Sequence, residues 1–148
     1  MTSSDPYLRR VAEVISQHGY AVQYVAGNPD IGARPFAYTV GLHALPSRGY
    51  ELAVSGLDDQ TSHQLLNTLA ATLADGRLAP ADGLEVSGVL QEELALRLRP
   101  VSRPEDLGII YALYGDTPPV WQALWPDQGR QFPDDAHFGL PAYAQPLL

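Results

Sequence analysis

The period of the hydrophobic pattern changes several times along the chain, and these changes constrain the fold most. Asp5 and Pro6 are typical of a helix start, and helical spacing of apolar residues then continues to Gly19, through Leu8, Val11 and Ile15 with Tyr7 and Val14. From Tyr20 the pattern alternates with a period of two through AVQYVA. The sequence therefore predicts a helix over 6–18 that leads directly into a strand.

Two further strands are predicted on either side of the turn residues ALPSRG. FAYTVGLHAL starts at Phe36, and YELAVSGL covers 50–57. If these segments form an antiparallel hairpin with Leu42 opposite Leu52 and Val40 opposite Val54, both apolar sets face the core. We therefore predict this register.

The rest of the chain continues the mixture of helices and strands. Asp58 and Asp59 cap a helix with an apolar face made by Leu65, Leu66, Leu69, Ala70 and Leu73. Strands are predicted in 85–90, 94–101 and 120–125, and a short helix after Arg103 has a predicted buried stripe of Leu107, Ile110, Tyr111 and Tyr114. This order favours an α+β fold, with a mostly antiparallel sheet of about five to six strands and two to three helices packed on it. We expect a single globular domain over 1–148, with an irregular C-terminal tail from about 127 to 148.

Composition excludes several classes of chemistry. The chain has no cysteine, which rules out disulfides, thiolate nucleophiles, cysteine-ligated zinc and iron–sulfur clusters. Its formal net charge is −8, and no basic cluster is longer than Arg9-Arg10. Because nonspecific nucleic-acid binding depends on clustered cations, we expect no nucleic-acid partner.

The sequence also predicts location and partners in outline. MTSSDPYLRR lacks the apolar core of a signal peptide, and nowhere do 18 apolar residues run together. We therefore expect a cytoplasmic acidic protein that has no membrane partner and no cofactor. Its expected partner is a small molecule or a protein, and a homodimer is possible.

One candidate site follows from the predicted hairpin. In that register the face opposite the apolar sets pairs His43 with Glu51, Gly41 with Ala53 and Thr39 with Ser55. The result is a strip of small residues edged by hydroxyls, with a histidine–carboxylate pair at the turn end. A neighbouring carboxylate could orient the imidazole as a base. The alternative is an ordinary surface ion pair beside a turn.

Three other groups of residues are candidates. His63 and Asn67 stand four apart on the second helix, so they could hold a ligand together or fix a loop carbonyl, although a satisfied, partly buried histidine is the alternative. Trp121 and Trp125 share one face of their strand, either as core, as a stacking platform for a flat ligand, or as an oligomer interface. Asp127 lies in the turn Pro126-Asp127-Gln128-Gly129, and Arg130 could pair with it or bind a carboxylate or phosphate. The histidines show neither HxH nor HExxH spacing, so no metal site is predicted.

FAYTVGLH, the helix with HQLLNTLA and the late VWQALWPDQGRQFP, in this order and spacing, give the chain a family likeness. It resembles the bacterial family catalogued as domain of unknown function 4262, over nearly its whole length. The family-like positions are Phe36, Tyr38, Thr39, Gly41, Leu42, Leu65, Leu66, Asn67, Trp125, Pro126, Asp127, Gly129, Arg130 and Pro133. The chain departs from the family before the predicted strand at 50–57, where SRGYEL stands in place of a fuller HPEL.

This resemblance implies no particular activity or cofactor, so two functions stay open. The first is a non-catalytic ligand-binding or protein-interaction module, with the strip Thr39, Gly41, His43, Glu51 and Ser55 facing the ligand. The alternative is a small hydrolase-like enzyme that uses His43 with Glu51 as a general acid–base pair, helped by Arg130 or His63. Convergence of titratable groups in a cleft would favour the enzyme.

Overall fold

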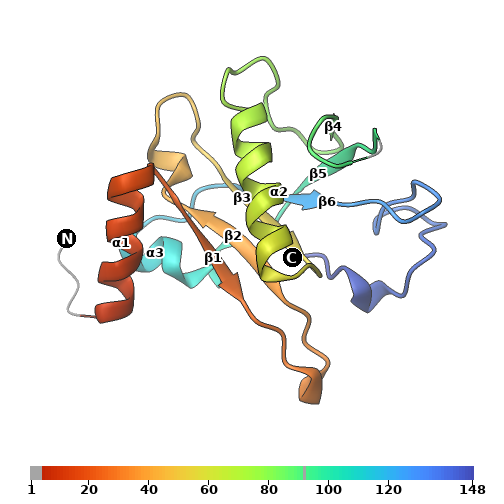
Figure 1. Cartoon of the computed structure of the whole chain (residues 1–148), viewed down its shortest axis with the longest axis horizontal. Coiled ribbons are helices and arrows are strands. Elements are labelled where there is room, and N and C mark those ends of the chain that lie inside the picture. The colour runs from red at the N-terminus through yellow and green to blue at the C-terminus, as the bar shows by residue number, and fades with distance from the viewer. Residues whose placement is uncertain (1–4, 92) are drawn as a thin grey trace.

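The computed structural model describes residues 5–91 and 93–148. Across these residues the chain forms three α-helices and six strands (Figure 1), in the order α1 (Pro6–His18), β1 (Ala21–Val25), β2 (Phe36–Val40), β3 (Glu51–Ser55), α2 (Asp59–Thr72), β4 (Glu85–Val86), β5 (Leu96–Pro100), α3 (Gly108–Tyr114) and β6 (Val120–Leu124). None of these helices is long and apolar enough to cross a lipid bilayer.

The strands form one sheet in the order β1-β2-β3-β6-β5-β4. All neighbouring strands are antiparallel except β3 and β6, which pair in parallel. The predicted α+β class with a mostly antiparallel sheet is therefore confirmed. The order also leaves β1 and β4 at the two edges of the sheet.

Helices cover both faces of the sheet. On one face α2 packs Leu66 and Leu69 against Leu52 and Val54. On the other face α1 and α3 pack their apolar side chains against Tyr38, Val40 and Ala53. In Figure 1, β1 runs between α1 and α2. Burial from both sides explains why β3 is buried at each of its five residues.

The helix starts follow the predicted capping. The Asp5 carboxylate accepts a hydrogen bond from the backbone N–H of Tyr7 at 2.8 Å, and α1 ends at Gly19, whose φ is 90°. At α2 the Asp58 carboxylate accepts from the N–H of Thr61 at 2.7 Å, and hydrogen bonding from the Thr61 side chain, then from this N–H, lowers the pKa of Asp58.

The third helix is split in two. Pro104–Asp106 form a 3₁₀ turn, and α3 begins only at Gly108. Leu107 and Ile110 are buried as predicted, but Tyr111 is 60% exposed, so its predicted place in the buried stripe is wrong. The short 3₁₀ turn changes the helical phase before α3 starts, which rotates Tyr111 outward.

The predicted register between β2 and β3 is also wrong, although the strands are antiparallel as expected. Phe36 pairs with Ser55, Ala37 with Val54 and Tyr38 with Ala53. Leu42 therefore does not pair with Leu52, because β2 ends at Val40 and the chain turns into the 3₁₀ helix η2 (Leu42–Ala44). The observed register differs from the predicted one by an odd number of residues. Each face of β2 therefore lies beside the face of β3 opposite to the predicted one, so that Tyr38 shares a face with Ala53 and Ala37 shares a face with Val54.

The segment after β6 covers one face of that strand. The tail contacts Gln122, whose side-chain amide donates to the Pro146 carbonyl at 2.8 Å and accepts from the N–H of Leu148 at 2.8 Å. Trp121 and Trp125 pack on the α2 side instead. The tail thus covers the Gln122 face of β6 within the chain, while Tyr143 in the same segment is 67% exposed.

Candidate functional site

The most densely bonded polar side chain near the predicted site is Glu51, the first residue of β3. Its carboxylate is fully buried, and it accepts a hydrogen bond from the Thr39 hydroxyl at 2.6 Å. It also accepts from the backbone N–H groups of Gly41, Leu42 and His43 at 2.9, 3.1 and 3.2 Å. The carboxylate therefore satisfies the N–H groups at the start of η2, which would otherwise be buried without partners.

His43 makes the fifth contact with this carboxylate. Its Nδ1 lies 2.5 Å from Oε2 of Glu51, and the histidine side chain is 11% exposed. The predicted contact between His43 and Glu51 therefore exists. It arises because η2 folds back over Glu51 and not because the two residues pair across strands, and the burial of Glu51 means that it is not a surface ion pair.

Tyr114 of α3 closes this site beside the imidazole. The two rings meet edge to face, with centroids 4.7 Å apart. Burial raises the pKa of the Tyr114 hydroxyl, and the negative charge of Glu51 raises it further. Gly41 is needed here, since its φ is 99° and a Cβ at this position would lie 2.7 Å from the Tyr114 hydroxyl oxygen.

The remaining residues of the predicted strip do not form an open surface. Thr39 and Ser55 are buried, and the corrected register separates them. Ser55 donates its hydroxyl hydrogen bond to the Pro146 carbonyl at 2.6 Å and accepts one from Gln122 at 3.1 Å. The polar groups of these two residues are thus occupied by the protein itself.

A groove at the edge of the sheet lies between α1 and α2, and we call it the edge groove. Its volume is about 490 Å³, and it is lined by Tyr7, Arg10, Val11, Val14 and His18 of α1, by Tyr20, Ala21, Val22 and Gln23 at β1, and by His63 and Asn67 of α2. The structure therefore brings the predicted pair His63 and Asn67 into a cavity.

Two tyrosines tie the walls of the edge groove to its floor. The Tyr20 hydroxyl donates to Oδ1 of Asn67 at 2.7 Å, and the Tyr7 hydroxyl donates to the side-chain oxygen of Gln23. Burial raises the pKa of Tyr20, and the positive charge of Arg48 opposes this rise. One tyrosine hydrogen bond thus fixes each helix to β1.

The charge of the edge groove differs from that of the whole chain. Its lining contains Arg10, His18 and His63 but no carboxylate, while the chain has a formal net charge of −8. His63 contacts Asp59 through Nδ1 at 2.8 Å. Within the described residues, no three metal-ligating side chains lie close enough together to hold an ion.

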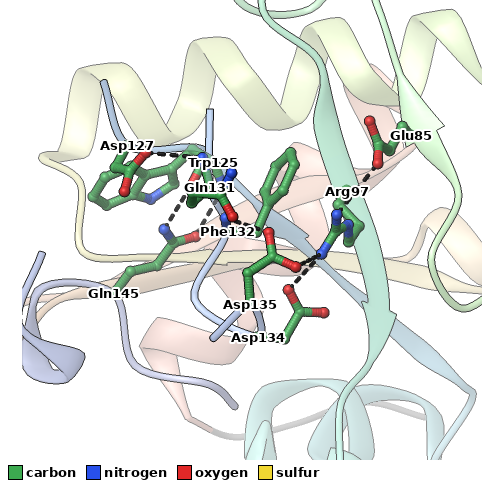
Figure 2. Close-up of polar contacts among 9 residues, drawn as sticks. All are labelled: Glu85, Arg97, Trp125, Asp127, Gln131, Phe132, Asp134, Asp135 and Gln145. Carbon is green, nitrogen blue, oxygen red and sulfur yellow. Dashed lines mark hydrogen bonds and ion pairs between the residues drawn. The ribbon is translucent and has the colours of Figure 1, made fainter. Parts of the chain in front are cut away.

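Figure 2 shows how Trp125 and Asp127 hold the segment after β6. The side-chain amide of Gln145 brackets Trp125, accepting from its backbone N–H and donating to its carbonyl, both at 2.8 Å. The Asp127 carboxylate accepts from the N–H of Gln131 at 2.8 Å and of Gly139 at 2.5 Å. Bonds to Gly139 and then Gln131 lower the pKa of Asp127, which acts here as a loop anchor.

A cluster of side chains around Arg97 of β5 fixes the same segment to that strand (Figure 2). Arg97 lies 2.8 Å from Asp134, 2.9 Å from Asp135 and 3.3 Å from Glu85, and its guanidinium stacks on Phe132. The hydrogen bond to the Asp135 carboxylate is the main cause of the raised pKa of Arg97.

Arg130 does not join this anchored cluster. It is exposed, and its side chain has no ion-pair partner among residues 5–91 and 93–148, Asp127 included. Its backbone N–H donates to the Asp127 carbonyl at 3.1 Å, and Arg130, rather than Gly129, takes the positive φ in this turn.

The comparison with known families agrees with this architecture. A family model described as a domain of unknown function (DUF4262) matches residues 14–139. The chain belongs to this family. The DUF4262 match begins inside α1 and ends at Gly139, so it includes every strand of the sheet. No curated protein and no solved structure was found to match the chain.

Several residues of these sites were not predicted. Arg10 and His18 belong to the α1 stripe at 7, 10–11, 14 and 18, of which only Val11 is buried. The signal was present in the sequence, because Arg10 and His18 are polar residues on the same helix face as the apolar stripe. Tyr114 was predicted as core only, since nothing local to α3 indicates His43 as its neighbour.

Proposed function

We propose that this DUF4262 domain is a non-catalytic binding module, and that its ligand is an anion held in the edge groove. The observation that carries the proposal is the charge contrast: the groove is lined by the Arg10 guanidinium and by no carboxylate, in a chain of net charge −8. A local positive potential on an acidic protein attracts anions to that place, because the rest of the surface repels them.

The side chains of the edge groove suit such a ligand. Among the described residues the Arg10 guanidinium has no hydrogen-bond or ion-pair partner, so its donors are free for a carboxylate or phosphate. Asn67, Gln23 and the two tyrosine hydroxyls supply directional polar groups nearby. The volume of about 490 Å³ is within the usual range of ligand sites. A cytoplasmic location remains part of the proposal.

A second candidate is the hydrolase-like enzyme, which the His43–Glu51 contact favours. The carboxylate holds Nδ1, so Nε2 of the neutral imidazole is left as the acceptor that a general base needs. Against this, Glu51 already accepts five hydrogen bonds that shape η2, and His43 is not among the residues that line the edge groove. We therefore favour the edge groove.

The proposal is tested by titrating the isotope-labelled protein with glutarate and with inorganic phosphate at low ionic strength, and with putrescine as a cationic control. Backbone amide signals of the edge-groove residues should shift with the anions and not with putrescine. Arg10→Gln should weaken binding at least tenfold. Arg9→Gln is the matched control, because Arg9 is the neighbouring arginine of α1 but does not line the groove. If the anions shifted the amide signals of the Arg10→Gln variant as they shift those of the wild type, with the same affinity, the proposal would be contradicted.

A further inference from the structure

We infer that the edge groove receives an extended acidic peptide segment of a partner protein, which adds to the sheet as a strand beside β1. This inference rests on the proposed function and names the class of its ligand. It begins from the position of β1, which has β2 as its one neighbour in the sheet. Alternate backbone N–H and C=O groups along the outer edge of such a strand have no strand partner.

The edge groove lies over this outer edge. Its lining combines α1, which packs on one face of the sheet, with α2, which packs on the other. A cavity that contacts helices from both faces and also contacts Ala21, Val22 and Gln23 must wrap around the strand that ends the sheet. The two helices are therefore the walls of the groove, and the edge of β1 is its floor.

The length of the edge groove matches a short strand. On α1 its lining extends from Tyr7 to His18, a span of roughly 17 Å at 1.5 Å per helical residue. From Ala21 to Val25, β1 extends over about 14 Å at 3.4 Å per residue. A peptide of about five extended residues thus fits along the groove from end to end.

The walls indicate which side chains such a peptide should carry. Side chains of an added strand alternate between the two faces of the sheet, so one row faces α1 and the other faces α2. The α1 wall presents Arg10 and His18, and the α2 wall presents His63 and Asn67. Main-chain hydrogen bonds to β1 would supply affinity for any extended peptide, whereas the Arg10 guanidinium favours acidic side chains.

A second copy of the chain suits this edge less well. Two-fold pairing along β1 keeps both α1 helices on the same face, and it brings Arg10 and His18 of one copy against the same residues of the other. The remaining charge of each copy is strongly negative, which opposes close approach. Charge complementarity therefore favours an acidic partner segment.

The test uses the full chain and three capped pentapeptides, Thr-Glu-Val-Glu-Thr, Thr-Gln-Val-Gln-Thr and Thr-Lys-Val-Lys-Thr. The glutamate peptide should shift the amide signals of β1 and bind at least tenfold more tightly than the glutamine peptide. The lysine peptide should bind most weakly. Arg10→Gln should abolish the preference for glutamate, and Arg9→Gln should retain it.

Backbone methylation of the glutamate peptide separates strand addition from charge attraction. Two versions carry N-methyl groups at odd or at even positions. Only one of the two sets of amides faces β1 in an added strand, so one version should lose binding and the other should retain it. Equal binding by both versions overturns the inference.

The remaining outcomes distinguish this inference from the proposed function. If glutarate binds in the edge groove but no pentapeptide does, the anion site stands and strand addition is overturned. If neither binds, both fall. A concentration-dependent dimer with shifted β1 amides, seen by sedimentation and by dilution, would make a second copy the occupant and would also overturn the inference.

Discussion

Replacing Glu51 by glutamine is expected to destabilise the fold severely, although the change removes only a charge and exchanges one atom. Oε1 of Glu51 accepts from the Thr39 hydroxyl and the Leu42 N–H, and Oε2 accepts from the Gly41 and His43 N–H groups and the imidazole. A glutamine amide has one oxygen and one NH₂ group. Whichever way the amide turns, its NH₂ faces at least one backbone N–H that is fully buried.

The magnitude follows from this arrangement. With the amide oxygen in the Oε2 position, Thr39 can rotate its hydroxyl and accept, but the Leu42 N–H loses its partner. A buried donor without a partner costs about 1–3 kcal/mol, and the remaining bonds weaken because they are no longer charge-assisted. We expect a total loss of about 2–4 kcal/mol, a large part of the roughly 5–15 kcal/mol by which a typical domain is stable.

Thermal and urea denaturation measure this loss. In a domain of this size each kcal/mol lowers Tm by about 2–4 °C, so Glu51→Gln should lower Tm by about 5–15 °C. Glu13→Gln is the matched control, since Glu13 is exposed on α1 and its change should stay within about 0.5 kcal/mol. If Glu51→Gln had the same Tm as the wild type, the hydrogen bonds to the Glu51 carboxylate would not be what stabilises η2.

Two further predictions test other parts of the structure. Gly41→Ala should lower Tm more than Gly49→Ala, because both glycines have positive φ but only at Gly41 does a Cβ meet another group, the Tyr114 hydroxyl at 2.7 Å. Tyr114→Phe should relieve part of that excess, and equal losses at the two glycines would contradict the packing argument. Asp127→Asn should cost stability at neutral pH and progressively less below about pH 3.9, since a folded pKa below the unfolded value gives stabilisation that is lost as pH falls. A deficit that stayed constant from pH 7 to pH 3 would show that ionisation of Asp127 is not involved.

The elements of the fold could be predicted because their signals are local. The Asp5-Pro6 cap and Gly19 give the bounds of α1, and period-two alternation gives the strands. Strand ends were harder, because β4 has only two residues and Gly88, with φ 86°, bends the chain soon after it. The parallel pair β3–β6 depends on a long crossover that includes α2, β4, β5 and α3, which no local pattern encodes.

The candidate site shows where local reasoning ended. The contact between His43 and Glu51 was predicted correctly, but from a strand register that is wrong. The alternating pattern continues past Val40, whereas the chain leaves the strand at Gly41. Alternation of apolar residues can continue into a 3₁₀ turn, so the pattern alone does not mark where β2 ends. What fixes the end of β2 is the buried carboxylate of Glu51, which lies eight to ten residues away.

The two sites are also connected through α1. The Gly41 turn packs against α1, where a Cβ on Gly41 would lie 3.2 Å from Ile15 and 3.4 Å from the carbonyl oxygen of Gly19. Glu51 holds that turn, and α1 is a wall of the edge groove, so the buried carboxylate supports the groove at a distance. A side chain used in this way positions a binding surface without touching its ligand. The same Glu51→Gln variant is therefore expected to move the amide signals of Val14 and His18 in the free protein.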